Sequence, residues 1–148
     1  MSKSDKWQIW TGEMTTSAGA TQQALRTLQG KARVELPEDY LDFLGWSNGA
    51  EGDIGPNFIQ IWPTERIAAN PYPFEEFVPG LLFMASDGGA ALFGFDTRAQ
   101  PMPIVVTHSD DLILDTLVTV APSFSAFLEF LTNHDWIEYW SDRRGTDS

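Results

Sequence analysis

The stretch LPEDYLDFLGWSNG, residues 36–49, carries the clearest local structural signals in the chain. Pro37 suits the first helical position, and the two acidic residues that follow it interact favourably with the positive end of the helix dipole. Asn48 and Gly49 stand at the other end, and both residue types accept the left-handed conformation that ends helices. The stretch therefore predicts a helix over residues 37–47. Its predicted buried face consists of Tyr40, Phe43 and Leu44.

Two further segments, one on each side of this stretch, have helical periodicity. Over residues 17–33, apolar residues recur at helical steps and form one stripe. Over residues 123–133, a continuous apolar face predicts a helix that packs onto a sheet, with Phe127 in the core. The first stripe consists of Ala18, Leu25, Leu28 and Ala32, and the second of Phe124, Phe127, Leu128 and Leu131.

The region between residues 58 and 120 is typical of strands. Short runs rich in β-branched and aromatic residues are separated by turn signals. The turn at residues 86–89, followed by alternating side chains, predicts a β-hairpin. A short helix is expected over residues 64–69 and a loop over residues 70–80. The expected strands cover residues 58–62, 81–85, 91–95, 104–107 and 116–120.

This order of elements favours an α+β fold. Helices come first, strands cluster in the middle and a helix closes the chain, so we expect a central, mostly antiparallel sheet of about five to six strands with helices packed against it. A length of 148 residues suits a single domain, 1–148. We expect its core at about 17–140, preceded by a short polar N-terminus and followed by a polar tail over 141–148.

Composition excludes several classes of function. The net charge of −12 disfavours direct binding to nucleic acid or to anionic membranes, because both would repel the chain. The chain has no cysteine, which removes disulfides, thiolate metal sites and cysteine nucleophiles. No apolar run has the length of a signal sequence or a membrane span, so a cytoplasmic protein is the expectation. We expect no metal and no cofactor.

Four motifs in order resemble the SUKH superfamily, which includes a fungal cell-wall-synthesis regulator and many bacterial immunity proteins. They are the capped helix with its glycine turn, a Trp-Pro pair before a short helix, a Gly-Gly hairpin and a closing helix, over about residues 17–131. Ala50 departs from the family pattern, where a second glycine is common. The resemblance implies an α+β domain without catalysis, often encoded beside the toxin that it neutralises. The motif residues are Pro37, Tyr40, Asn48, Gly49, Trp62, Pro63, Asp87, Gly88, Gly89 and Asp96.

The candidate partner-binding residues are acidic side chains expected in loops and turns. Their simpler interpretation is solvated loop acids. The functional alternative is a negative face that meets a basic toxin domain, for example a nuclease, whose phosphate-binding surface must be basic. Trp10 is either docked on the sheet or offered to a partner as an aromatic anchor. The acidic candidates are Glu51, Asp53, Glu75, Glu76, Asp110 and Asp111.

Two other functions stay open at this point. The first is a regulatory scaffold that binds a cellular protein, as the fungal relatives suggest. The second is a hydrolase that uses the loop around His108, where Ser109 and Asp110 supply the residue types of a catalytic triad. Adjacent loop residues point apart, which argues against a triad in this loop. The primary expectation, implied by the resemblance, is a non-enzymatic immunity protein that occludes its toxin by direct binding.

Overall fold

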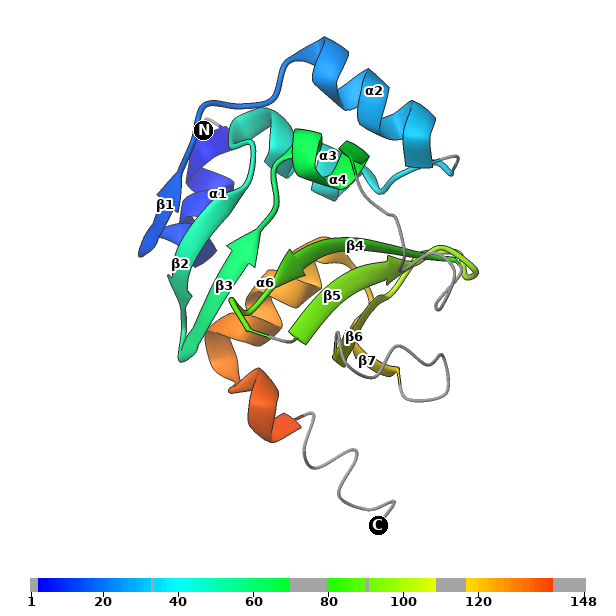
Figure 1. The fold of residues 1–148 in the computed structure, drawn as a ribbon. Helices are drawn as coiled ribbons and strands as arrows, with labels where there is room; N and C mark the ends of the chain where they lie inside the picture. The colour runs from blue at the N-terminus through cyan, green and yellow to red at the C-terminus, as the bar shows by residue number, and fades with distance from the viewer. Residues whose placement is uncertain (1–2, 33, 70–79, 90, 109–116, 140–148) are drawn as a thin grey trace.

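The fold is built on one antiparallel sheet whose strands follow one another in sequence order, from β1 to β7 (Figure 1). A computed structural model describes residues 3–32, 34–69, 80–89, 91–108 and 117–139. Within these residues the strands are β1 (Met14–Thr16), β2 (Ala50–Ile54), β3 (Asn57–Ile61), β4 (Leu81–Ser86), β5 (Ala91–Asp96), β6 (Ile104–His108) and β7 (Val118–Ala121). The helices are α1 (Lys3–Thr11), α2 (Gln22–Ala32), α3 (Glu38–Trp46), α4 (Thr64–Ala69) and α6 (Phe124–Asn133). The expected α+β class with a mostly antiparallel sheet is confirmed.

The core lies between the sheet and the helices. Figure 1 shows α1 and α6 behind the sheet and α2, α3 and α4 at its upper end. Tyr40 of α3 meets Phe95 of β5 and Phe124 of α6, with ring centroids 4.9 and 5.2 Å apart. Trp7 of α1 packs edge-on against Phe43 at 5.3 Å. Aromatic rings from three helices and one strand therefore form a single apolar cluster, a large source of stabilisation.

The closing helix α6 follows its sequence signals closely. The Ser123 side chain accepts a hydrogen bond from the Ala126 backbone N–H at 3.1 Å, which caps the helix start. Phe127 is completely buried and meets Phe93 of β5 at 5.1 Å. Asp39 of α3 accepts hydrogen bonds from both the backbone N–H and the hydroxyl of Ser125 at 2.9 Å. These contacts fix α6 to α3 and to the sheet.

The sheet has more strands than the predicted five to six, because β1 and β2 were not expected. The sequence of β2, Ala50–Ile54, contains Gly52 and two acids, which are residue types with low strand propensity. The strand forms because its neighbours on both sides pair with it: Gly52 lies opposite Met14 of β1 and Ile59 of β3. Tertiary pairing overrides local preference here.

The first predicted helix, residues 17–33, is shorter than expected. Helix α2 begins at Gln22, and the preceding residues are extended along the end of α3. The Ala20 N–H donates to the Leu44 carbonyl, and the Asn48 N–H donates to the Ala18 carbonyl. These bonds occupy the backbone that a longer helix would need. The prediction that Ala18 belongs to the helical stripe was therefore wrong.

Smaller differences concern the ends of elements. Pro37 is the N-cap residue of α3 rather than its first helical residue, and its carbonyl accepts from the Leu41 N–H at 3.1 Å. The hairpin at residues 86–89 forms as predicted, with Asp87 accepting from the Gly89 N–H at 2.9 Å. The predicted loop over 70–80 lies outside the described residues except for its last residue. Among the helices that the structure describes, none is long and apolar enough to cross a membrane.

Candidate functional site

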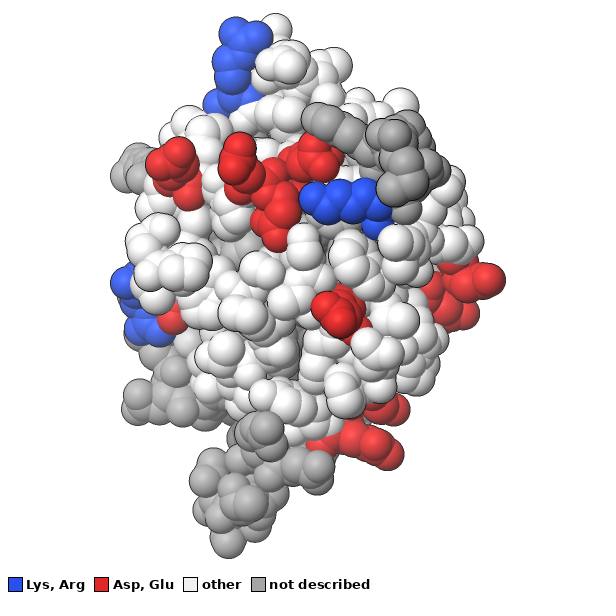
Figure 2. Space-filling view, turned by 180° about the vertical axis from the view of Figure 1, so that it is seen from behind, with Lys and Arg blue, Asp and Glu red and all other residues white. Residues whose placement is uncertain are grey.

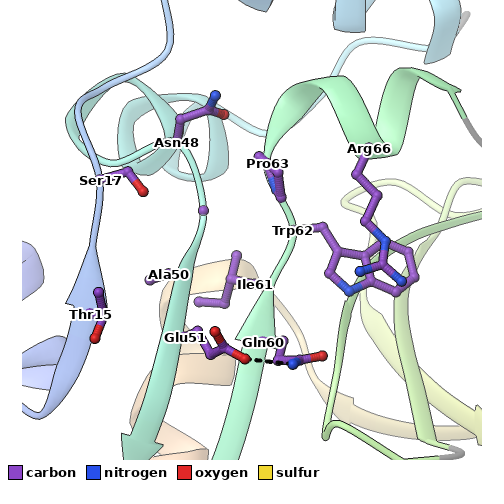
Figure 3. Close-up of a pocket in the computed structure, with 11 residues that line it drawn as sticks. Thr15, Ser17, Asn48, Ala50, Glu51, Gln60, Ile61, Trp62, Pro63 and Arg66 are labelled. Carbon is purple, nitrogen blue, oxygen red and sulfur yellow. Dashed lines mark hydrogen bonds between the residues drawn. The ribbon is translucent and has the colours of Figure 1, made fainter.

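An open hollow of about 280 Å³ lies on the solvent-facing side of β1, β2 and β3, next to the start of α4 (Figure 3). We call it the Trp62 hollow. Its walls come from β1 and from the consecutive elements β2, β3 and α4, which the sheet brings together with β1. It is lined by Thr15, Ser17, Asn48, Gly49, Ala50, Glu51, Gln60, Ile61, Trp62, Pro63 and Arg66.

The floor of the hollow is crossed by a row of polar side chains on β1, β2 and β3, which continues beyond the hollow to Ser86 of β4. Register places Thr15 opposite Glu51, Glu51 opposite Gln60, and Gln60 opposite Ser86. The Gln60 amide donates to the Glu51 carboxylate at 2.6 Å and accepts from the Ser86 hydroxyl at 3.1 Å. Because every second residue of a strand faces the same side, this row stands on the outer face of the sheet.

Asn48 and Gly49 form the upper wall of the hollow. Their contacts give a structural reason for the presence of these two residues in the motif. The Asn48 side chain accepts from the Thr64 N–H at 2.8 Å and donates to the Glu65 carboxylate at 3.0 Å, which joins the end of α3 to the start of α4. Gly49 has a φ of 89°, and a Cβ there would lie 2.7 Å from the Ile61 carbonyl oxygen. No other residue type fits this backbone without strain.

Hydrogen bonds also set the charge of Glu65, which is exposed beside this wall. Its pKa is lowered, first by a hydrogen bond from its own backbone N–H and then by the Asn48 amide. Hydrogen-bond donors stabilise the ionised carboxylate and so lower its pKa. Glu65 is therefore a fixed negative charge next to the Trp62 hollow.

The right-hand wall is formed by Trp62 and Arg66. The Arg66 guanidinium carbon lies 4.2 Å from the centre of the Trp62 ring, which is a cation–π contact. It joins the end of the chain segment before Pro63 to helix α4. Trp62 is only 4% exposed, and its Nε1–H has no hydrogen-bond acceptor in the described structure. A buried donor without an acceptor costs about 1–3 kcal/mol. The hollow thus has a buried indole N–H without a described acceptor beneath the exposed, positively charged side chain of Arg66.

The predicted acidic candidates are only partly brought together. Glu51 and Asp53 are exposed, but they stand on strand β2, so the expectation that they lie in loops was wrong; pairing with β1 and β3 makes the segment a strand. Glu51 lines the Trp62 hollow, and Asp53 faces the same side two residues further along β2. The other four acids, Glu75, Glu76, Asp110 and Asp111, lie outside the described residues.

The two tryptophans near the N-terminus lie on helix α1, where Trp7 belongs to the core and Trp10 packs against it. Trp7 is completely buried, and its indole N–H donates to Asp42 of α3 at 3.2 Å. Trp10 is half-buried, with its ring 6.0 Å from that of Trp7. Both belong to α1, which the sequence did not reveal because its apolar residues have no helical period.

The described residues contain neither a complete triad around His108 nor a metal-binding cluster. His108 is the last residue of β6, while Ser109 and the acids after it lie outside the described residues, so the triad hypothesis stays untested. Among the described residues, no group of three His, Asp or Glu side chains is placed to hold a metal ion. A second open hollow, of about 270 Å³, lies between β7 and α6 and is lined by Phe130 and His134, among others.

The surface charge is spread over both sides of the molecule. Figure 2 shows a group of acidic side chains next to a basic one in the upper part of the face opposite to that of Figure 1, with further acidic side chains near the middle and along the right edge. The Trp62 hollow, on the other side, carries Glu51 with Asp53 and Glu65 beside it. Charge alone therefore does not select one contact face.

Six residues of the hollow were not among the predicted site residues: Thr15, Ser17, Ala50, Gln60, Ile61 and Arg66. Two signals were present. Phe58, Gln60 and Trp62 alternate and so share one face of a strand. Trp62 and Arg66 are four residues apart, a spacing that brings side chains together at a helix start.

Comparison with known protein families gives a match over most of the chain. The SMI1 / KNR4 family (SUKH-1) matches the chain over residues 19–129, which include α2 to β7 and the first part of α6. Helix α1 and strand β1 precede the matched region. No curated protein matches the chain.

Proposed function

Because the chain belongs to the SMI1 / KNR4 family (SUKH-1), which includes toxin immunity proteins, we propose that it is an immunity protein. It binds a cognate toxin in the cytoplasm and occludes the surface that the toxin uses. No covalent bond is made or broken by the immunity protein. The family match over most of the chain is the observation that carries this proposal.

The proposed toxin is a basic domain, with nucleases as the favoured class. A net charge of −12 attracts a basic partner and speeds its encounter. Exposed Glu51, Asp53 and Glu65 offer charges on one face that a phosphate-binding surface would meet. Occupying that surface with carboxylates keeps the nucleic acid out.

The proposal expects an open reading frame beside this gene to encode a toxin with a toxic C-terminal domain, and the first experiment is co-expression of this chain with that domain. Cells that express the toxin domain alone should stop growing, and cells that also express this chain should grow. An unrelated protein of similar size and net charge serves as the control for non-specific electrostatic binding. Growth arrest that persists in the presence of the folded chain would reject the immunity function.

The second experiment separates binding from catalysis. Purified toxin domain is titrated with the chain while its activity is followed. Occlusion predicts that inhibition is complete near one equivalent and is reversed when the two proteins are separated. Complete inhibition by a small fraction of an equivalent, or toxin that stays inactive after separation, would indicate an enzymatic activity instead.

A further inference from the structure

The Trp62 hollow has an unmatched donor at one end and an unneutralised acid at the other. At the first end, Trp62 is buried with its Nε1–H unpaired, and Figure 3 shows the indole nitrogen on the edge of the ring that faces Gln60. The Arg66 guanidinium lies over the same ring and makes no ion pair with another described residue. Two neighbouring donors of this kind suit one oxygen acceptor, such as a backbone carbonyl.

The other end has the opposite character. Glu51 is exposed and receives one hydrogen bond, from Gln60, which leaves most of its acceptor capacity free. Asp53 follows on the same face of β2, opposite the exposed ring of Phe58 on β3. A Lys or Arg side chain would find a carboxylate here and an apolar ring beside it.

The spacing between the two ends fits an extended chain. Glu51 stands opposite Gln60, and Trp62 lies two residues beyond Gln60 on the same face, so Glu51 and Trp62 are diagonal neighbours across the two chain segments. Diagonal neighbours of this kind lie about 7–8 Å apart, close to the distance of about 7 Å between side chains on one face of an extended peptide. One extended segment can therefore place a basic side chain at Glu51 and an oxygen acceptor at Trp62 and Arg66.

We propose that the Trp62 hollow and the adjoining face of β2 and β3 form the toxin contact, and that they receive an extended basic segment of the toxin. The inference rests on the proposed immunity function. Trp and Arg are the residue types most often found to dominate binding at interfaces, which suits Trp62 and Arg66 as the anchor. Arg66 is exposed at the surface, so its side chain can turn from the ring toward an incoming carbonyl.

The test uses the full chain and the toxin domain encoded by the neighbouring gene, with its catalytic residue inactivated. The chain is labelled with ¹⁵N, and the Trp62 indole signal is assigned by its absence in Trp62→Phe. Binding should move this signal in the direction that a new hydrogen bond produces. The signal of Trp7, whose indole already donates to Asp42, should stay in place.

Affinity is measured in parallel on surface variants with matched controls. Glu51→Gln and Arg66→Gln should each weaken binding by about tenfold, as expected for anchor residues. The controls Glu129→Gln on α6 and Arg26→Gln on α2 remove the same charges from exposed positions elsewhere and should change Kd by less than about twofold. Melting temperatures confirm that all four variants are folded under the binding conditions.

The outcomes separate the two proposals. If the wild-type chain binds the toxin domain but the Trp62 signal and the Kd values of both hollow variants are unchanged, the immunity function stands and the hollow is not the contact. If the wild-type chain does not bind the toxin domain, both proposals fall. A shifted Trp62 signal together with weakened Glu51→Gln and Arg66→Gln variants supports the hollow.

Discussion

The hydroxyl group of Tyr40 is buried among apolar rings and has no hydrogen-bond partner in the described structure. The ring itself packs well, against Phe95 and Phe124. The aromatic ring therefore stabilises the core, while its hydroxyl loses its hydrogen bonds to water without replacement.

Removing this hydroxyl should stabilise the protein. Tyr40→Phe is expected to raise the free energy of unfolding by about 1–2 kcal/mol, because a buried unsatisfied group is lost and the ring stays. Urea unfolding measures the change. Tyr139→Phe is the matched control: its hydroxyl donates to the Thr119 carbonyl at 3.2 Å, so its removal should bring no gain. Equal midpoints for Tyr40→Phe and wild type would show that the hydroxyl has a partner in solution.

The same residue predicts a dependence on alkaline pH. Burial raises the pKa of Tyr40 far above its usual value of about 10, because the charged form is poorly solvated in the core. In the unfolded chain the group ionises near pH 10, so its contribution to stability is present below that pH and is lost as the pH rises above it. The stability advantage of Tyr40→Phe over wild type should therefore widen between about pH 9 and about pH 11. A constant difference would contradict the raised pKa.

Among the elements, α6 depends most clearly on one apolar face. Phe127 is fully buried on that face against Phe93. Phe127→Ala should lower the free energy of unfolding by about 3–5 kcal/mol, the usual cost of a cavity of this size. Phe58→Ala is the control, since that ring is 44% exposed and should cost much less. Similar losses in the two variants would mean that the helix is not held by Phe127.

The elements that the sequence predicts best are those with a strong apolar period or a clear cap. Helices α3 and α6 and the β4–β5 hairpin belong to this group, because their local signals agree with their tertiary role. Helix α1 and strand β2 could not be predicted in this way. Trp7 holds α1 through contacts with distant α3 and α6, and β2 is held by its two neighbouring strands.

The candidate site was predictable only in fragments. Asn48, Gly49, Trp62 and Pro63 are motif residues, and Glu51 was a candidate acid. Their convergence with Arg66 depends on the pairing of β2 with β3 and on the turn into α4, which no local pattern specifies. The charge pattern also misplaced Glu51 and Asp53 in a loop, because acids and glycine are typical of turns.

For the whole molecule, long-range electrostatic attraction should control how fast the toxin domain associates. The double variant Glu51→Gln and Asp53→Asn is expected to associate more slowly and with a weaker dependence on salt, at an almost unchanged melting temperature. Stopped-flow measurements over a range of ionic strength give the association rates. Further variants neutralise the remaining candidate acids with the same types of substitution, at Glu75, Glu76, Asp110 and Asp111. Glu35→Gln with Glu129→Gln removes two exposed charges elsewhere and should have a smaller effect. If instead Trp10→Ala abolishes binding and rates do not depend on salt, the anchor is apolar.

The order of the strands also bears on how the molecule opens. Each strand pairs with the next one along the chain, but the connection from β1 to β2 is the longest, because it contains both α2 and α3. Closing a longer loop costs more entropy, and β1 is also a short strand at the edge of the sheet. Amides of β1 should therefore exchange with deuterium by local fraying, whereas those of β5, in the interior of the sheet, should exchange only when the whole protein unfolds. Strand β1 can therefore detach by local unfolding while the other strands of the sheet stay paired.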